Sequence, residues 1–528
     1  MSSRFTRFLV SPSVVLALAA MVVSASAGPA WAQFNPLRQF PDTSDGIYVF
    51  VDQLPNLTVA QRLFAATHYV GTQKQTAGLI DAIRVYNPDF IMIQYRLGVR
   101  ESGHSGNYIH HNTWSNDWPN IDAHNEWFIP HWDTNPDPRV YQLYDGWLKE
   151  YCMDLSGEIV GGTGTPTAYG WKEYWVDCVI HDIDDSHGDG VFADSTHPPY
   201  AVPSDQYDSP IGSPPHKAYI YHLEKYYDYV YEQFTLANKY FIPNVGHLFN
   251  TADTTNGYYE DVHGAMVEGF ATNWTEYDWR LQQNRTLRLL RNGKIYIAQN
   301  GPSGPTDISG RLWYMSNFLL LKHDRSYVNM LGAGTQMHWW PEYDLALGEQ
   351  LDPSIADDVI ELREPVSGIY YRWYEHGLVL VNCNGVTRNF ALDGDYDFRL
   401  VTPWGGGAVG TGGTPAAGGL NLANVTGSLQ MDPWSGAILL ARLLGDANED
   451  GMVDGLDYVA WSNSYDQTGG WGEADFDYST VVDGLDYVIW SNHYGNAMTP
   501  GLALVPEPAG LAMLALGALA LLRRRRRP

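Results

Sequence analysis

The feature that most constrains the fold is a regular alternation of short apolar runs and longer amphipathic stretches between residues 35 and 360. The apolar runs are continuous, which is typical of strands buried on both faces in a parallel sheet. The candidate strands are 47–51, 90–95, 151–154, 190–194, 241–245, 265–270, 295–299 and 328–332. The clearest candidate helices are 171–184, 218–237, 277–291 and 311–323. Eight such units predict a (β/α)8, or TIM, barrel over residues 33–360.

A doubly wound open sheet is the rival arrangement for alternating strands and helices. Eight repeats without a glycine-rich phosphate loop favour the closed barrel. Two long inserts, 98–140 and 195–215, each follow a candidate strand and are rich in Trp, His, Asn, Pro and Asp. Because loops that follow barrel strands lie at the carboxyl face, we expect these inserts to border the functional site.

The pattern changes at about residue 361, where short strands are separated by Gly and Asp turns. Candidate strands are 368–373, 378–382, 398–401 and 437–440, and the Gly-rich segment 405–419 is expected to be a loop. We therefore predict a small antiparallel β domain, similar to a β-sandwich, over residues 361–443. The predicted fold class is α/β: a TIM barrel, then this β domain, then an α-helical EF-hand-like module.

Residues 446–486 contain an internal repeat, because Gly-Leu-Asp-Tyr-Val occurs at 455–459 and again at 484–488. Each copy has oxygen-bearing side chains at loop positions 1, 3, 5, 9 and 12 and a backbone carbonyl at position 7, the spacing of an EF-hand calcium loop. The predicted ligands are Asp446, Asn448, Asp450, Met452, Asp454 and Asp457 in the first loop, and Asp475, Asp477, Ser479, Val481, Asp483 and Asp486 in the second. Thr480 stands where such loops carry Gly, so we expect a strained turn and weaker calcium binding in the second loop.

Two such loops, each followed by one helix and each with Asp at position 12, resemble a dockerin type I module over residues 444–497. The resemblance implies Ca²⁺ as a cofactor and docking to a cohesin-like protein. The alternative is a calcium-stabilised stalk that binds no partner.

Both ends of the chain have the layout of sorting signals. Residues 1–32 combine Arg4 and Arg7, an apolar run and the small-residue site at 30–32, as a signal peptide does; a membrane anchor is the alternative, but the run is short. Residues 503–528 combine Val-Pro-Glu-Pro, an apolar run and an Arg cluster, and resemble the PEP-CTERM sorting signal. That resemblance implies processing by an exosortase after transient membrane insertion. We expect export to the periplasm, the cell surface or the medium.

Charge and cysteine content exclude some classes of function. Acidic residues outnumber basic ones, 60 to 32, and the net charge of −28 repels phosphate backbones, so we expect no nucleic-acid partner. The three cysteines exclude a disulfide framework, although a single Cys152–Cys178 bridge stays open. Histidines and aspartates gathered between residues 104 and 133 lack a compact metal-ligand spacing, so solvated loop side chains are the better interpretation.

Two carboxylates end apolar candidate strands: Asp194 in Asp-Gly-Val-Phe-Ala-Asp and Glu268 in Ala-Met-Val-Glu. An acidic side chain at such a position is costly unless it is paired or functional. Glycoside hydrolysis needs two carboxyl groups that face one cleft, and TIM barrels place catalytic groups at the carboxyl ends of strands. We therefore predict Asp194 and Glu268 as catalytic, with loop capping or pairing to an Arg as the structural alternative.

The segments 189–194, 267–270 and 371–382 resemble those of hypothetical glycosyl hydrolase family 15 and, more distantly, α-galactosidase-like and polygalactosaminidase-like barrels. The resemblance spans roughly residues 40–400. It implies a retaining glycoside hydrolase that acts on an extracellular polysaccharide or oligosaccharide and needs no cofactor for catalysis. It further implies that Asp194 is the nucleophile and that Glu268 is the acid/base.

Other polar and aromatic side chains at predicted strand ends are candidates for carbohydrate binding. They are Asp52, Tyr95, Arg96, Asp154, Gln299, Asn300, His338, Trp339, Trp340 and Glu342. Of these, Glu342 is also a rival acid. Two other functions stay open: a non-catalytic glycan-binding or structural surface protein on a barrel scaffold, and a polysaccharide lyase.

Overall fold

The computed structural model describes residues 34–102, 117–129, 139–144, 148–155, 169–196, 214–246, 260–272, 275–332 and 337–497. The predicted signal peptide and the predicted sorting tail lie outside these residues, as do most of the two long inserts. Within the described ranges, no helix is both long enough and apolar enough to cross a membrane.

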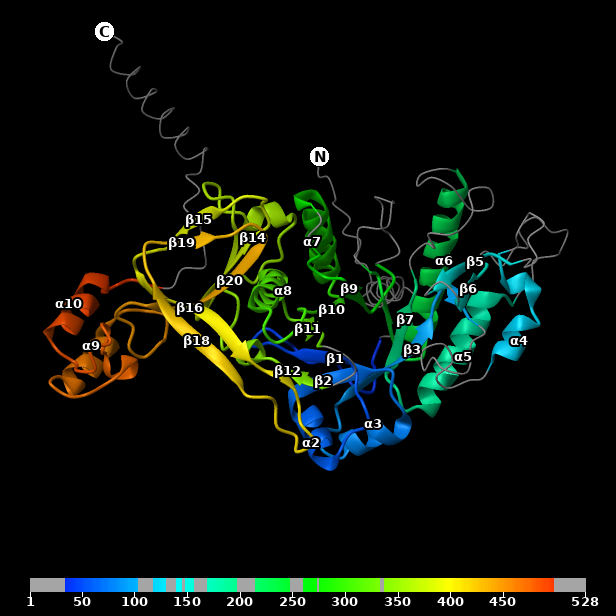
Figure 1. Ribbon diagram of the computed structural model, residues 1–528, viewed down its shortest axis with the longest axis horizontal. Coiled ribbons are helices and arrows are strands. Elements are labelled where there is room, and N and C mark those ends of the chain that lie inside the picture. The colour runs from blue at the N-terminus through cyan, green and yellow to red at the C-terminus, as the bar shows by residue number, and fades with distance from the viewer. Residues whose placement is uncertain are drawn as a thin grey trace, which may run out of the picture.

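An eight-stranded parallel sheet forms the predicted TIM barrel (Figure 1). In order around the barrel, its strands are β1 (Val49–Gln53), β2 (Tyr69–Gln73), β3 (Ile91–Leu97), β7 (Gly190–Asp194), β8 (Tyr240–Pro243), β9 (Gly264–Glu268), β10 (Ile295–Asn300) and β11 (Ser326–Met330). Strands β8 and β9 close the ring. His263 N donates to Phe241 O at 3.0 Å, and Val245 N donates to Met266 O at 3.0 Å.

In the described part of the chain, six helices lie between successive barrel strands and cover the outside of the barrel, as the alternation predicts (Figure 1). They are α2 (Val59–His68), α3 (Ala77–Arg84), α5 (Trp171–Asp185), α6 (Pro214–Leu236), α7 (Glu276–Arg291) and α8 (Ile308–Leu321). Their starts follow ordinary capping rules, since the Thr58 and Thr275 side chains accept hydrogen bonds from the first turns of α2 and α7. The four helices expected from the sequence correspond to α5, α6, α7 and α8.

The inside of the barrel is filled with apolar side chains at alternate strand positions. They include Phe50, Ile93, Phe192, Ile242, Met266, Ile297 and Tyr327. Phe34 and Phe40, from the segment before β1, pack against this cluster. The intervening strand residues point outward and pack against the helices. Because side chains alternate along a strand, the interior residues that follow these apolar ones lie at the carboxyl end of the barrel.

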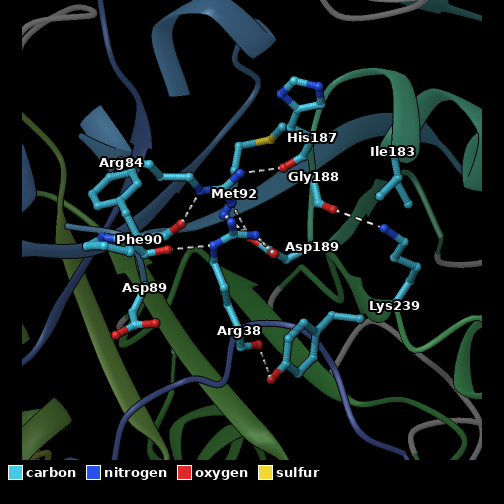
Figure 2. Close-up of polar contacts among 12 residues, drawn as sticks. Arg38, Arg84, Asp89, Phe90, Met92, Ile183, His187, Gly188, Asp189 and Lys239 are labelled. Atoms are coloured by element: carbon cyan, nitrogen blue, oxygen red, sulfur yellow. Dashed lines mark hydrogen bonds and ion pairs between the residues drawn. The ribbon is translucent and has the colours of Figure 1, made fainter. Parts of the chain in front are cut away.

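At the amino end of the barrel, one carboxylate ties three segments together (Figure 2). Asp189, just before β7, pairs with Arg38 at 3.0 Å and with Arg84 at 2.6 Å, and its side chain is 2% exposed. The same carboxylate accepts a hydrogen bond from Met92 N at 2.9 Å. Its charge is fully paired, so it joins the N-terminal segment and α3 to the sheet.

Two strand predictions are corrected by the structure. Strand β2 has no counterpart in the prediction, because its Tyr-Val-Gly-Thr-Gln mixes apolar and polar residues and follows α2 without a turn. Residues 151–154, predicted as the third barrel strand, lie outside the barrel, in an insert between β3 and α5. That insert contains β4 (Arg100–Glu101), α4 (Trp118–Asp122), a 3-10 turn (Asn125–Trp127), β5 (Tyr141–Tyr144) and β6 (Leu148–Cys152). Its three strands pair antiparallel, in the order β4-β6-β5.

A small antiparallel β domain follows the barrel, as predicted. Its five-stranded sheet has the order β13-β14-β20-β16-β18, and β20 and β14 pack against α8 (Figure 1). The strands after the barrel are β12 (His338–Trp339), β13 (Tyr370–Tyr374), β14 (Gly377–Asn382), β15 (Arg388–Ala391), β16 (Tyr396–Gly405), β17 (Gly407–Ala408), β18 (Gly418–Val425), β19 (Ser428–Met431) and β20 (Ser435–Leu443). Two 3-10 turns, Pro341–Asp344 and Val359–Leu362, precede β13. The expected Gly-rich loop lies mostly between β16 and β18.

The sequence repeat forms two loop-helix units, with helices α9 (Gly455–Ser464) and α10 (Gly484–His493) and a 3-10 turn at Trp471–Glu473 between them (Figure 1). The units exchange equivalent hydrogen bonds. Trp461 Nε1 donates to Asp483 O at 2.8 Å, and Trp490 Nε1 donates to Asp454 O at 2.9 Å. Each helix therefore supports the loop of the other unit.

Candidate active site

A ring of polar side chains occupies the carboxyl end of the barrel. Seven of its members lie two residues beyond an interior apolar residue of a barrel strand. The eighth, Lys74, follows β2, and its Nζ lies 4.9 Å from the centre of the Tyr95 ring. In strand order, the ring consists of Asp52, Lys74, Tyr95, Asp194, Asn244, Glu268, Gln299 and Asn329. The structure thus brings together both predicted catalytic carboxylates and three of the predicted binding residues.

Asp194 ends β7 and accepts hydrogen bonds from three neutral donors. Tyr95 Oη donates to one carboxylate oxygen at 2.6 Å. The other oxygen accepts from Ser195 N at 2.7 Å and from Asn244 Nδ2 at 2.9 Å. Burial and the nearby Asp194 charge raise the pKa of Tyr95 well above its ordinary value, so its hydroxyl keeps its proton. These donors fix the orientation of the Asp194 carboxyl group, and none of the three is a cation.

Asn244 connects the two catalytic candidates. Its Nδ2 lies 2.9 Å from an Asp194 oxygen and 2.6 Å from a Glu268 oxygen, while its own oxygen accepts from Gly246 N at 2.9 Å. The gap between those two carboxylate oxygens cannot exceed the sum of the first two distances. That bound agrees with the carboxyl separation of roughly 5–5.5 Å in retaining glycosidases, and it lies below the roughly 6.5–9.5 Å of inverting ones.

Glu268 ends β9 and is exposed to solvent at the mouth of the barrel. Protein atoms still surround its carboxyl group closely enough that burial raises its pKa, and the charge of Asp194 raises it further. The hydrogen bond from Asn244 and the charge of Lys74 act in the opposite direction. The net rise favours the protonated form of Glu268, which a general acid requires.

Asp52 and Lys74 form an ion pair on the other side of the mouth. The Lys74 ammonium lies 3.0 Å from an Asp52 oxygen, and the two side chains are 13% and 24% exposed. Gln73 Nε2 donates to the same Asp52 oxygen. The ammonium also lies over the rings of Tyr95 and Phe192, 4.9 and 5.5 Å from their centres. This pair therefore borders the same space as Asp194.

Further polar groups complete the ring near β10 and β11. Asn329 Nδ2 donates to Gln299 Oε1 at 3.1 Å. His338 lines a cavity of about 70 Å³ together with Asp52 and Asn329, which places it beside the ring. The predicted binding residue Asn300 instead donates its amide to Phe270 O at 2.5 Å, so its side chain holds the turn after β9.

Five predicted binding residues are placed away from the ring. Arg96 faces outward from β3 and forms ion pairs at 3.2 Å with Glu101 and 2.8 Å with Asp117. Asp154 is buried after β6, where its N–H donates to Trp127 O at 2.9 Å. It therefore does not end a barrel strand, which corrects the position that the sequence predicts for it.

The other three lie in β12 or just after it. Trp339 donates its indole N–H to Asp344 at 3.1 Å and packs against α2. Trp340 is fully buried and donates to Met330 O at 3.0 Å. The rival acid Glu342 forms a bidentate pair with Arg311 at 2.7 and 2.5 Å, with both side chains 0% exposed. Substrate cannot reach a carboxylate that is buried and paired in this way.

Sequence reasoning missed three members of the ring: Lys74, Asn244 and Asn329. A signal for the last two is present, because Ile242 and Tyr327 fill the interior and the next interior position is polar. Glu150 is a further buried carboxylate that the prediction missed. It pairs with Arg100 at 3.1 Å, while burial and the charge of Asp194 raise its pKa. Its arginine partner makes it a weaker candidate acid than Glu268.

In the C-terminal module, the predicted calcium ligands line the two loops that precede α9 and α10. In the second loop, one carboxylate oxygen from each of Asp475, Asp477 and Asp486 lies within 4.8 Å of the others. The position-12 residues Asp457 and Asp486 are fully buried. Thr480 takes φ +73°, close to the φ +82° of its counterpart Gly451. A non-glycine residue is therefore held in the left-handed region, which is strained for it.

Comparison with known families gives one match: the profile described as "Hypothetical glycosyl hydrolase family 15" matches residues 84–378. This region runs from the end of α3 through the barrel to β14, and it includes Asp194, Asn244 and Glu268. No curated protein sequence matches the chain.

The chain is also similar to several solved structures, three of which follow. An α-amylase from Geobacillus thermoleovorans has 10% identity and a TM-score of 0.37, covering 76% of this chain and 98% of its own. A trehalulose synthase from Pseudomonas mesoacidophila has 10% identity and a TM-score of 0.40, with coverages of 76% and 99%. An isomaltulose synthase from Protaminobacter rubrum has 8% identity and a TM-score of 0.39, with coverages of 76% and 99%. The barrel is defined by the topology of the parallel sheet.

Proposed function

The chain belongs to hypothetical glycosyl hydrolase family 15, and from that premise we propose that it hydrolyses glycosidic bonds of an extracellular glycan by a retaining mechanism. The observation that carries this proposal is the position of Asn244 Nδ2, 2.9 Å from Asp194 and 2.6 Å from Glu268. It keeps the two carboxyl groups close enough for one to attack the anomeric carbon while the other protonates the leaving oxygen.

In the first step, the Asp194 carboxylate attacks the anomeric carbon and Glu268 donates its proton to the departing glycosidic oxygen. The donors on Asp194 hold the attacking carboxylate in one orientation. The product is a glycosyl ester on Asp194, whose carboxyl group then carries no charge.

In the second step, the loss of charge on Asp194 removes one of the causes that raise the pKa of Glu268. The pKa of Glu268 therefore falls, and its carboxylate accepts a proton from the water that attacks the ester. The sugar is released with its original anomeric configuration. No cofactor takes part in this sequence of steps.

Trapping and substitution test this proposal together. The purified protein is screened on a panel of polysaccharides and aryl glycosides, and a fluorinated analogue of any substrate is used to accumulate the ester. Mass spectrometry should then find the sugar on Asp194, and both Asp194→Asn and Glu268→Gln should abolish turnover while the melting temperature is retained. A different result would show a non-catalytic glycan-binding protein instead: the wild type and both variants bind a glycan equally well, and none of the three proteins cleaves it.

We further propose that the two loops of the C-terminal module bind Ca²⁺. Carboxylate and carbonyl oxygens are the ligands that this ion prefers, and the three carboxylates of the second loop already converge. Calorimetric titration with CaCl2 should detect two sites, the weaker of which is lost in Asp475→Asn. The variant Thr480→Gly should tighten that site, since Gly adopts a positive φ without strain.

For the partner of this module, we propose a cohesin-like protein. The exposed apolar residues of α9 recur at equivalent positions of α10: Leu456 with Leu485, both 61% exposed, and Val459 with Val488, 48% and 47% exposed. Exposed apolar residues that gather in one patch mark a site of interaction with another protein, whereas single exposed apolar residues do not. A cohesin domain should bind in a calcium-dependent manner and lose binding to the double variant Leu456→Asp/Leu485→Asp.

We also propose that the protein is exported, because residues 1–32 and 503–528 have the layout of sorting signals. We expect removal of residues 1–32 during secretion and exosortase processing of the tail. Mass spectrometry of the protein recovered from the periplasm, the cell surface or the medium tests this directly, since an intact N-terminus and tail would contradict both steps.

A further inference from the structure

The strand order places Asp52, on β1, across the mouth of the barrel from the two candidate catalytic carboxylates, and Lys74, which follows β2, pairs with it there. Strand β1 is three strands from β7 in one direction around the barrel and three from β9 in the other. Asn244, which joins Asp194 and Glu268, follows β8, the strand directly across from β1. A sugar whose anomeric carbon lies beside Asp194 therefore extends its far edge toward Asp52 and Lys74.

Lys74 is held in a conformation that its own sequence does not favour. Its φ is +60°, although it is not glycine, and its backbone N–H donates to Ile93 O at 3.2 Å. A left-handed residue of this kind costs free energy that the surrounding structure must supply. The result is that its side chain turns over the mouth of the barrel, above Tyr95 and Phe192.

The pair presents both a donor and an acceptor to that space. An ammonium group has three N–H donors, and within the described part of the chain its polar partner is Asp52, at 3.0 Å. Asp52 accepts from Lys74 and Gln73 through one oxygen. Because Lys74 and Asp52 neutralise each other, the pair as a whole attracts neither anions nor cations.

We propose that Asp52 and Lys74 bind two neighbouring free hydroxyl groups on the terminal sugar of a neutral glycan, and that this makes the enzyme act from chain ends. This inference rests on the proposed glycosidase function and specifies its substrate. Lys74 donates to one hydroxyl oxygen, and Asp52 accepts the proton of the next. A sugar bonded further along the chain at either oxygen loses that contact, so internal residues fit poorly.

The test uses the full-length protein and the aryl glycoside that it cleaves best, together with monodeoxy and mono-O-methyl derivatives of the same sugar. Lys74→Met removes the donors and keeps the length of the side chain. Asp52→Asn removes the negative charge and replaces one of the two acceptor oxygens by an NH2 donor. Lys239→Met is the matched control, because Lys239 also pairs with an aspartate, Asp184 at 2.7 Å, but lies just before β8 at the amino end of the barrel. Melting temperatures report whether each variant folds.

We expect Lys74→Met and Asp52→Asn each to lower kcat/KM on the parent glycoside by about 10- to 100-fold, the range of a hydrogen bond to a charged group. On the deoxy derivative that lacks the hydroxyl bound by the substituted residue, each variant should have nearly the same kcat/KM as the wild type, because that contact is already absent. Lys239→Met should match the wild type on every substrate. On a polysaccharide, the wild type should release single sugars with little early loss of viscosity.

Three results would overturn the inference: equal losses on the parent and on all derivatives, a preference for uronic acid glycosides, or rapid loss of viscosity through internal cleavage. Each of them requires a wild-type enzyme that turns over glycosides and depends on Asp194. If no glycoside is cleaved, or if Asp194→Asn retains activity, the proposed function itself is wrong, and the two failures are thereby separated. If Lys74→Met does not fold, direct binding of the deoxy series to Glu268→Gln supplies the same comparison.

Discussion

One aspartate, Asp189, precedes strand β7, and another, Asp194, is its last residue. The two carboxylates differ in the charge of their neighbours. Asp189, at the amino end, is 2% exposed and pairs with two arginines (Figure 2). Asp194, at the carboxyl end, receives hydrogen bonds from a phenol, a backbone N–H and an amide, and its nearest charged neighbour through Asn244 is another acid, Glu268.

The contrast distinguishes a buried charge that stabilises the fold from a charge that is available for catalysis. Two guanidinium groups neutralise Asp189, and removal of one partner would leave a buried charge uncompensated. Neutral donors orient Asp194 without neutralising it, so the carboxylate remains able to attack, and its charge affects the proton affinity of Glu268. The four predictions that follow test this division, beginning with the largest effect.

Asp194→Asn should lower kcat by on the order of 10⁴- to 10⁶-fold, the range for loss of a group that acts within a catalytic unit. The melting temperature should stay close to that of the wild type, because the substitution removes charge beside Glu268 and keeps the shape of the side chain. Steady-state kinetics and calorimetry on the same sample measure both quantities. Activity within tenfold of the wild type would show that Asp194 is not the nucleophile.

Asp189→Asn should show the reverse behaviour. We expect a loss of about 3–5 kcal/mol in the free energy of unfolding, because Arg38 and Arg84 lose their common partner at a buried site. Urea denaturation measures this, and kcat per folded molecule should change little. A large loss of kcat with unchanged stability would contradict the division between the two ends.

Asn244→Ala should have an intermediate effect, with a decrease in kcat of about 10²-fold, as expected when catalytic groups shift by about 1 Å. The two carboxyl groups lose their shared donor, so their spacing is no longer fixed. Asn244→Asp is a useful contrast, because it adds a third carboxylate and should raise the pKa of Glu268. If both variants have wild-type kinetics, Asn244 does not position the Asp194 and Glu268 carboxyl groups.

The smallest effect concerns pH. Glu268 must be protonated to act as an acid, so kcat/KM falls as pH rises through its pKa. The charge of Lys74 lowers that pKa and the charge of Asp52 raises it. Lys74→Met should therefore move the basic limb of the pH profile to higher pH, whereas Asp52→Asn should move it to lower pH. Shifts in the same direction for both variants would exclude this electrostatic coupling.

Several features could be read from the sequence because they depend on local spacing. Continuous apolar runs such as 190–194 predicted buried parallel strands, and the regular alternation predicted the barrel and four of its helices. The positions of Asp194 and Glu268 at the carboxyl ends of β7 and β9 followed from the same runs, since side-chain direction alternates along any strand.

Other features were decided by contacts between distant residues. The five residues of β2 become a strand because they pair with β1 and β3, and their own apolar pattern is too weak to show it. Residues 151–152 have a strand-like pattern but pair in the inserted sheet. Glu342 could not be distinguished from a catalytic acid until Arg311, 31 positions earlier, was found beside it.

For this protein, then, the sequence by itself determined seven of the eight barrel strands, the repeated loops and the presence of two acids at strand ends. Tertiary structure alone decided that Asn244 joins those acids and that Lys74 and Asp52 face them across the mouth. The physical reason is that hydrophobic periodicity fixes which face of a strand a residue occupies. Closure of the sheet then fixes which residues from different strands meet, and the chemistry of the site depends on those meetings.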